Sequence, residues 1–311
     1  MKEMGFIVRE GNDAPLMREL TTLRLGGRVL AEVRLQDPEA AAKLPELAER
    51  LGGRLASIGA GSNILAGDGD LPFVLVRNSL EPEVGLLADD SKKAVVRAAG
   101  SVKLPVLLGR LASMDLGGLE GLAGIPATVG GAVAMNAGSY GQSIADTLVA
   151  MTVVTEKGAV RTIDRADIDF GYRSLLVPGH LGGTGLAGSG RAWFLILSAE
   201  FSLTRKEAGV VAALGKECME KKKATQPITA ASAGCVFKNP DEATSAGKLL
   251  EDAGLKGKRL GGMAFSEIHA NFLCNEGSGT AAEAFELISM AKEAVRAKFG
   301  IELQTEVAIW V

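Results

Sequence analysis

The chain has 311 residues, of which 47% are hydrophobic, with a formal net charge of -3 and a sequence pI of about 5.7. This length is enough for two or three hydrophobic cores, because domains usually hold roughly 100–200 residues. The slightly acidic balance supplies no basic face of the kind that nucleic-acid backbones require, so nucleic acid is not an expected partner.

Segments that would direct the chain to a membrane are not expected. The first residues, MKEMGFIVREGNDAP, have charged side chains among a few apolar ones, unlike the apolar region of a signal peptide. No stretch reaches the roughly 18 uncharged apolar residues that a membrane helix needs. The three cysteines, Cys218, Cys235 and Cys274, are spaced for neither paired disulfides nor a CxxC metal site. We therefore expect a cytoplasmic protein without a metal or a membrane partner.

The first eighty residues predict a parallel α/β subdomain. Alternating polarity predicts a strand over residues 30–35, and Asp37-Pro38 supply the N-cap and first position of a helix that runs to Gly52-Gly53. Further strands are expected over residues 54–58 and 73–77, with glycine-rich loops between them.

The middle of the chain predicts β-rich structure around a glycine-rich stretch. A hairpin is expected where Glu156-Lys157-Gly158 separates two apolar runs. The predicted elements are a strand from residue 93, a short helix over 105–111, the glycine-rich stretch 117–141, hairpin strands over 151–155 and 159–163, a glycine-rich loop over 180–190, and a strand over 193–201.

The last third predicts an α+β unit of its own. Thr204 is expected to cap a helix that continues to about Lys223, where Gln226-Pro227 ends it. The elements expected after it are a strand over 235–237, a helix over 246–253, a strand over 268–274, a helix over 280–299, and a final strand that reaches residue 311.

Two glycine-rich loops carry the first hint of function. The segment GAGSN, residues 59–63, follows a predicted strand, and bare backbone N–H groups in such a loop can hold a pyrophosphate. It lacks the helix that should follow a Rossmann fingerprint, and a tight turn explains it equally well. The stretch 117–141 permits close approach to a flat, charged ligand, although a packed Ω-like loop is the alternative. Together the two loops favour a dinucleotide.

Three side chains are candidates for chemistry. Arg173, in FGYRSL, can hold a carboxylate with two hydrogen bonds, although a surface arginine is the commoner explanation. Glu306 is a charge inside an apolar terminal strand, where burial would favour a shared proton and an edge strand would favour exposure. Cys235 is either a small buried side chain or a proton donor, since an ordinary thiol is mostly protonated at neutral pH.

Other polar residues give weaker signals. Lys223 ends the run KECMEKKK, which is typical of a solvated helix end but can also face a diphosphate. His180 and His269 have no metal-ligand spacing, and packing or hydrogen bonding is the better explanation of His269.

An ordered set of motifs resembles one known family over nearly the whole chain, the UDP-N-acetylenolpyruvoylglucosamine reductases. The matching segments are TTLRLGG at 21–27, GAGSNIL at 59–65, GLEGLAGIPATVGGAVAMNAGSYG at 118–141, GYRSL at 171–175, SAGCVFKNP at 232–240, AGKLLEDAGLKG at 246–257, HANFLCN at 269–275 and TEV at 305–307.

The resemblance implies a fold of the α+β class. Its FAD-binding domain would be of the vanillyl-oxidase (PCMH) type and would consist of two α/β subdomains, residues 1–80 and 81–204. An α+β substrate domain would span residues 205–301, and residues 302–311 would form a strand that returns to the flavin side. We expect such a protein to be a monomer.

The resemblance also implies an activity, the reduction of UDP-N-acetylglucosamine enolpyruvate to UDP-N-acetylmuramate for peptidoglycan, with non-covalent FAD and with NADPH as hydride donor. Arg173 and Glu306 would flank the enolpyruvyl carboxylate and stabilise the enolate formed on hydride transfer, and Cys235 would protonate the adjacent carbon. Tyr172, Lys223 and Asn239 would contact the substrate. The residues expected to bind FAD are Gly59, Ala60, Gly61, Ser62, Asn63, Ile64, Gly124, Ile125, Pro126, Thr128, Gly130, Gly131, Ala132 and Asn136.

The sequence departs from the family pattern at two positions. Cys235 stands where well-known members have a serine, which keeps an acidic hydrogen but adds sensitivity to oxidation. Ala127 stands where the family usually has glycine. Tyr140 and Tyr172 both belong to other motifs, so the chain resembles the subtype without a substrate-loop tyrosine, with loop 180–190 as a possible partial lid.

Two other functions fit the same sequence less well. An oxidase of the same FAD fold would use oxygen, but no histidine in the flavin-loop motifs is available for a covalent flavin link. A binding protein that had lost its chemistry should lack the acid, the arginine or the glutamate, and all three positions are filled here.

Overall fold

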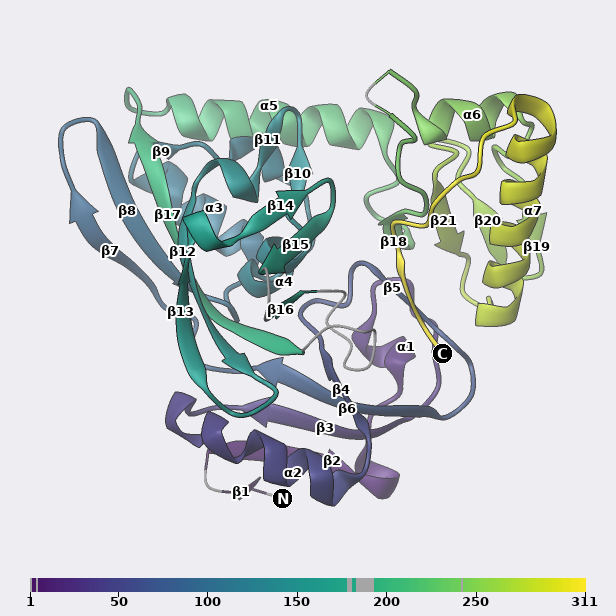
Figure 1. Ribbon diagram of the computed structural model, residues 1–311. Helices are drawn as coiled ribbons and strands as arrows, with labels where there is room; N and C mark the ends of the chain where they lie inside the picture. Colours follow the sequence, from purple (N-terminus) through teal and green to yellow (C-terminus); the bar gives the residue numbers. More distant parts are fainter. Residues whose placement is uncertain (1, 4, 178–180, 183–192, 242) are drawn as a thin grey trace. The chain divides into compact units, whose positions relative to one another are not determined.

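The computed structural model describes residues 2–3, 5–177, 181–182, 193–241 and 243–311 (Figure 1). It divides into two compact units. Unit 1 comprises residues 1–14, 30–60 and 72–220, and unit 2 comprises residues 15–29, 61–71 and 221–311. His180 and the proposed lid, apart from Leu181–Gly182, lie outside the described residues. No helix in the described part of the chain has both the length and the apolar character needed to cross a membrane.

The N-terminal sheet of unit 1 is mixed, and not purely parallel as the sequence predicts. Strands β4 and β6 pair in parallel, whereas β1 with β2 and β2 with β3 pair antiparallel. The difference arises because residues 2–10, which were not assigned to a strand from the sequence, add two strands at one edge. The strand order is β1 (Lys2–Glu3), β2 (Phe6–Glu10), β3 (Val29–Leu35), β6 (Leu71–Asn78) and β4 (Arg54–Ser57).

The helix predicted after Asp37 is two shorter helices. Asp37 does cap it, since its carboxylate accepts a hydrogen bond from the Glu39 N–H, and Pro38 occupies the first turn. However, Pro38–Lys43 is a 3-10 helix (η2), and the α-helix α2 covers only Leu44–Leu51. Pro45 explains the break, because a residue without an N–H is tolerated only in the first turn of an α-helix.

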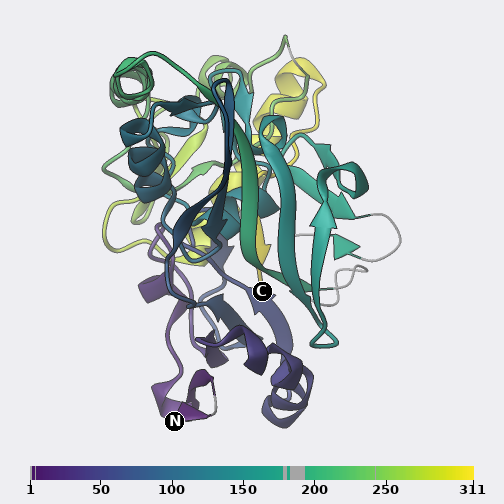
Figure 2. The ribbon, with the colours of Figure 1, turned by 90° about the vertical axis from the view of Figure 1, so that its left-hand side faces the viewer.

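A second sheet of unit 1 has the order β13-β12-β17-β8-β7, and its long strands are seen in Figure 2. The short strand β9 pairs with the C-terminal end of β17. The β12–β13 hairpin confirms the predicted one. Thr204 lies in β17 and does not cap a helix, because β17 stays paired with β8 as far as Lys93. The strands are β7 (Val84–Asp89), β8 (Lys93–Ala99), β9 (Leu116–Gly117), β12 (Leu148–Thr155), β13 (Val160–Asp164) and β17 (Phe194–Arg205).

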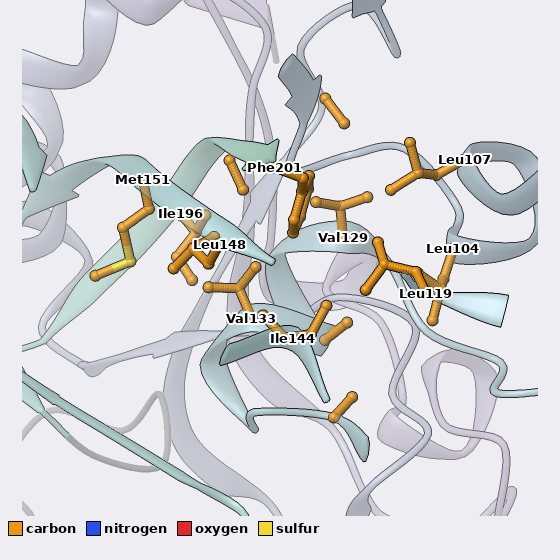
Figure 3. Close-up of a cluster of buried hydrophobic side chains, with 14 of the residues drawn as sticks. Leu104, Leu107, Leu119, Val129, Val133, Ile144, Leu148, Met151, Ile196 and Phe201 are labelled. Carbon is orange, nitrogen blue, oxygen red and sulfur yellow. The ribbon is translucent and has the colours of Figure 1, made fainter. Parts of the chain in front are cut away.

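Helices α3 (Leu104–Ser113) and α4 (Val129–Ala134) share a buried core with this second sheet. Figure 3 shows Leu104 and Leu107 of α3 and Val129 and Val133 of α4 beside Phe201. The glycine-rich stretch thus forms no long helix or strand, as expected. Its other elements are η3 (Glu120–Leu122) and β10 (Gly138–Ser139). The elements after it are β11 (Gln142–Ser143), η4 (Ile144–Asp146), η5 (Arg165–Asp167), β14 (Asp169–Gly171), β15 (Ser174–Val177), β16 (Leu181–Gly182) and α5 (Val210–Thr225).

The described part of unit 2 contains an antiparallel sheet, the three helices α1, α6 and α7, and a separate parallel strand pair. The predicted helices are confirmed, with Thr280 as the N-cap of α7. Of the predicted strands, 235–237 is displaced to β18, and 268–274 begins only at Phe272, because Ser266 Oγ accepts the N–H groups of Ile268 and His269 in a turn. The elements are α1 (Met17–Leu20), β5 (Ile64–Ala66), β18 (Ala231–Cys235), α6 (Ala246–Asp252), β19 (Arg259–Leu260), β20 (Met263–Phe265), β21 (Phe272–Asn275), α7 (Ala281–Phe299) and β22 (Ala308–Trp310).

Candidate active site

The loop of residues 59–63 has backbone geometry suited to an anion. Within the described residues, the N–H groups of Ala60, Gly61 and Ser62 donate no hydrogen bond. Gly61 has φ +65°, and a Cβ there would lie 2.1 Å from the Leu20 carbonyl oxygen, so only glycine fits. Successive N–H groups beside a left-handed residue form an anion-binding concavity. N–H groups arranged in this way are of the kind that can hold a diphosphate, and FAD binding by this loop stays a prediction.

The second glycine-rich segment uses its N–H groups within the protein. Thr128 caps α4, and its Oγ1 accepts the Gly131 N–H. The Val129 N–H donates to Val102 O at 2.8 Å, and the Gly130 N–H to Gly100 O at 3.0 Å. The first turn of α4 therefore offers a ligand no free donor at these three positions, which a glycine-rich motif alone does not reveal. FAD contact by this segment stays a prediction.

Ala127, the departure from the family pattern, causes no backbone strain. It is buried and is not among the non-glycine residues with positive φ. Its carbonyl oxygen accepts the Leu104 N–H at 2.8 Å, at the first residue of α3. An alanine methyl group is therefore accommodated at this position.

Asn136 supports the loop that carries Arg173. It is buried with φ +41°, and its Nδ2 donates to Gly171 O at 3.1 Å while its Oδ1 accepts the Ala145 N–H at 3.0 Å. The side chain thus uses its amide to hold the start of the β14–β15 turn. No pattern in the sequence indicates this link, since Asn136 and Gly171 are 35 positions apart.

Arg173 occupies a constrained position in that turn. Gly171 pairs with Ser174, so Tyr172 and Arg173 form the two-residue connection. Arg173 has φ +53°, which is unfavourable for a residue with a side chain and is often found at functional sites. Its Nη2 donates to Gly138 O at 2.8 Å, and its guanidinium lies 5.1 Å from the centre of the exposed Tyr172 ring. These contacts orient a half-buried cation.

Unit 2 brings Glu306 next to Cys235 along the backbone. Cys235 is the last residue of β18, and the Glu306 N–H donates to the carbonyl of the following residue, Val236, at 2.7 Å. An isolated bridge between Phe237 and Thr305 extends this pairing. Glu306 and Cys235 are both half-buried. Contrary to the sequence prediction, Glu306 precedes the terminal strand, because β22 begins only at Ala308.

The first glycine loop is joined to the same structure. The Asn63 Nδ2 donates to Glu306 O at 3.2 Å, and Asn63 O accepts the Ala308 N–H at 2.9 Å. Immediately afterwards β5 and β22 pair in parallel, with Ile64 opposite Ala308. Asn63, Cys235 and Glu306 thus belong to one hydrogen-bonded assembly in unit 2, whereas Arg173 belongs to unit 1.

The remaining predicted site residues have surface or structural positions. Lys223 lies exposed in the last turn of α5, as a solvated helix end would. Asn239 is exposed, and its Oδ1 accepts the Ala246 N–H at 3.0 Å at the start of α6. Neither position is tested as a substrate contact, so both remain predictions.

His269 and Cys274 lie outside this assembly and have largely buried surroundings. His269 Nδ1 accepts the Asn271 N–H at 3.2 Å, and its ring meets Phe272 edge-on, which confirms the packing role; burial lowers the pKa of His269. Burial, helped by Glu276, raises the pKa of the Cys274 thiol to about 11. Across the described residues, no group of three His, Cys, Asp or Glu side chains could hold a metal.

Comparison with known proteins gives two matching family models. An FAD binding domain matches residues 29–164, and the C-terminal domain of UDP-N-acetylenolpyruvoylglucosamine reductase matches residues 226–310. The reductase of Nitratidesulfovibrio vulgaris is 46% identical over 297 residues, 96% of this chain and 97% of that protein. The chain belongs to the UDP-N-acetylenolpyruvoylglucosamine reductase family. The resemblance inferred from the ordered motifs is confirmed.

Two further members of the UDP-N-acetylenolpyruvoylglucosamine reductase family extend the match. The protein of Oleidesulfovibrio alaskensis is 47% identical over 298 residues, 95% of this chain and 96% of its own length. The crystal structure of the Thermus caldophilus enzyme has a TM-score of 0.77 at 31% identity and covers 98% of this chain and 100% of that one. The predicted α+β class with an FAD-binding PCMH-type domain is confirmed.

Proposed function

We infer that the chain reduces UDP-N-acetylglucosamine enolpyruvate to UDP-N-acetylmuramate, a step of peptidoglycan synthesis, with FAD as cofactor and NADPH as hydride donor. The observation that carries this conclusion is the 46% identity to a named reductase over 96% of this chain and 97% of that protein. The substrate is therefore a small UDP-sugar.

The residues of the first glycine loop fit FAD. The unused N–H groups of Ala60, Gly61 and Ser62 are donors for its pyrophosphate. FAD supplies the transfer of hydride from NADPH to the enolpyruvyl double bond, a two-electron step that amino-acid side chains cannot perform. We propose that the rest of the expected set lines the cofactor, namely Gly59, Asn63, Ile64 and the expected residues between Gly124 and Asn136.

Arg173 and Glu306 are proposed to stabilise the charge that develops on the substrate. The Arg173 guanidinium pairs with the enolpyruvyl carboxylate, where its fork of N–H donors matches two oxygens. Its hydrogen bond to Gly138 O preorganises it, so that little orientation is needed when the substrate binds. Glu306, held by Val236 and Asn63, shares a proton with the enolate.

Cys235 is proposed to deliver the proton that completes the product. The S–H bond breaks, a C–H bond forms at the carbon next to the carboxylate, and the sulfur keeps the electron pair until solvent reprotonates it. The half-buried position of Cys235 at the end of β18 suits this exchange with solvent. Lys223 and Asn239 are proposed to contact the UDP portion of the substrate, and Tyr172 is proposed to contact the substrate beside Arg173.

Organisation and environment complete the proposal. We propose FAD subdomains over residues 1–80 and 81–204, a substrate domain over 205–301, and a terminal segment over 302–311. We propose a monomer in the cytoplasm, which suits an enzyme that acts on a nucleotide-activated sugar.

A stopped-flow experiment tests the function. The purified holoenzyme is reduced with NADPH without oxygen and then mixed with UDP-N-acetylglucosamine enolpyruvate while the flavin absorbance band is followed. We expect the oxidised spectrum to return rapidly. A flavin that stays reduced until oxygen enters would identify an oxidase instead. A protein that cannot be loaded with FAD would identify a binding protein without redox chemistry.

A further inference from the structure

The segment TTLRLGG, residues 21–27, has no role in the proposed chemistry, yet it contacts two parts of the predicted site within unit 2. We propose that Thr22 is a positioning residue, which holds the strand of Cys235 in register with the glycine loop at 59–63. This inference rests on the proposed function and adds a residue outside the expected catalytic and binding sets.

Thr22 donates one hydrogen bond to the glycine loop at 59–63 and one to β18. Its backbone N–H donates to Gly61 O at 3.2 Å, in the middle of the proposed pyrophosphate loop. Its hydroxyl Oγ1 donates to Ser232 O at 2.6 Å, a favourable distance for an O–H···O hydrogen bond. Ser232 lies three residues before Cys235 on β18, so one side chain connects the two segments directly.

The hydroxyl bond lies at an irregular point of the sheet. Ser232 pairs with Cys274 and Cys235 pairs with Phe272, so the β18 side has one residue more than β21 between the two pairs. Gly234, inside this bulge, has φ +76°. Bulges re-aim side chains and are frequent beside active sites. By holding Ser232 O, Thr22 defines the start of the bulge that sets the direction of the Cys235 thiol.

The segment around Thr22 is itself firmly held. The buried Thr21 donates its hydroxyl to Leu25 O at 3.3 Å, and a Cβ on Gly26 would lie 2.6 Å from the Cβ atoms of Met17 and Ala66. From the other side, Asn275 Nδ2 donates to Leu23 O at 3.1 Å. Thr22 therefore projects from a rigid support, which a positioning role requires.

The two hydrogen bonds of Thr22 can be separated by mutation. Thr22→Val keeps the backbone bond to Gly61 and nearly the same shape, but it loses the hydroxyl bond to Ser232. Only β18, which carries Cys235, should then lose its connection to Thr22. We expect substrate-dependent reoxidation of the flavin to slow by about tenfold to hundredfold, as for a misplacement of about 1 Å. Reduction of the flavin by NADPH should stay close to the wild-type rate.

Controls distinguish positioning from general damage. Thr22→Ser retains the hydroxyl and should restore reoxidation, whereas Thr21→Val removes a hydroxyl bond that stays within the segment and should leave the ratio of the two half-reactions unchanged. The alkylation rate of Cys235 by iodoacetamide in the resting holoenzyme gives a second measurement, which Thr22→Val should change and Thr21→Val should not. If Thr22→Val does not fold, Thr22→Ala replaces it.

The experiment distinguishes failure of the proposed role of Thr22 from failure of the proposed reaction. A wild-type enzyme without substrate-dependent reoxidation would refute the proposed reaction, and this inference with it. If the wild type performs both half-reactions, equal slowing of both in Thr22→Val, or no change in their ratio, would overturn the positioning role alone. Selective slowing that Thr22→Ser rescues would establish it.

Discussion

The side-chain amide of Asn63 donates to the carbonyl oxygen of Glu306 over 3.2 Å, between residues that are 243 positions apart in the chain. Asn63 was expected from the sequence only as a cofactor ligand. The structure gives its side chain a second role, because its amide holds the backbone of Glu306, the proposed catalytic glutamate. The carbonyl oxygen of Asn63 also accepts the Ala308 N–H.

Asn63→Ala should therefore impair turnover as well as FAD retention. The variant loses the bond to Glu306 O, and the carboxylate then lacks one of its backbone supports. We expect kcat at saturating FAD to fall by about tenfold to hundredfold, the usual cost of a misplaced catalytic group. Steady-state kinetics with added FAD measure this, and the exposed Asn12→Ala serves as the control. Full recovery by excess FAD would show that Asn63 serves only the cofactor.

Substitution of Cys235 tests the proton donor. Cys235→Ser keeps an exchangeable hydrogen and should retain substantial turnover. Cys235→Ala cannot donate a proton, so kcat should fall by about a hundredfold or more, the usual contribution of a positioned acid. The slow step should be product formation, with flavin reduction by NADPH unaffected in single-turnover experiments. Near-normal kcat in Cys235→Ala would assign the proton to another group.

Replacement of Arg173 tests the carboxylate contact. Arg173→Ala removes the counter-charge of the proposed enolate, and kcat/KM should fall by about a hundredfold to a thousandfold, as for loss of a preorganised donor. Arg173→Lys keeps the charge without the two-pronged geometry and should recover only part of the loss. The exposed Arg110→Ala on α3 is the matched control. Unchanged kinetics in Arg173→Ala would exclude this residue from the site.

The pH dependence of thiol labelling should separate two cysteines. Burial raises the pKa of Cys274 to about 11, so this thiol stays protonated and unreactive at neutral and mildly alkaline pH. In a Cys218→Ser background, iodoacetamide should label the half-buried Cys235 first, and Cys274 only as the pH approaches its pKa. Peptide mass spectrometry quantifies both sites. Equal labelling of the folded protein at neutral pH would contradict this environment for Cys274.

His269 should make the protein less stable in mild acid. Burial lowers the pKa of His269 below its ordinary 6.5, so the unfolded chain binds a proton more readily than the folded one. Stability is unaffected above pH 6.5 and falls as the pH drops from there toward the lower folded-state value. Urea unfolding at about pH 7.5 and about pH 5 should show a smaller loss for His269→Asn than for the wild type. Equal losses of unfolding free energy in His269→Asn and the wild type would contradict the lowered pKa of His269.

Local signals in the sequence predict many elements but not their limits. Glu156-Lys157-Gly158 predicts the β12–β13 hairpin, and Thr280 predicts the start of α7, because turns and caps depend on neighbouring residues. Thr204 was expected to cap a helix, but it lies in β17 because pairing with β8 continues past it. Tertiary pairing there outweighs the local preference of a threonine for an N-cap position.

The same distinction holds for the site. The sequence predicts a reductase with FAD, because ordered motifs over the whole chain record a family even when each motif alone is ambiguous. It does not show that the first-turn N–H groups of α4 are already bonded within the protein. That depends on Gly100 and Val102, which are close to Val129 and Gly130 only in the folded chain.

By itself, the sequence determined the family, the cofactor, the reaction and most secondary-structure elements, since these follow from residue identity and short-range periodicity. Only the tertiary structure decided that Asn63, Cys235 and Glu306 form one hydrogen-bonded assembly, and that Thr22 joins the glycine loop to β18. These links connect residues about 40 to 240 positions apart, and their acceptors are backbone carbonyl oxygens, which every residue has and which leave no pattern in side-chain identity. They exist only after the core of unit 2 has closed around them.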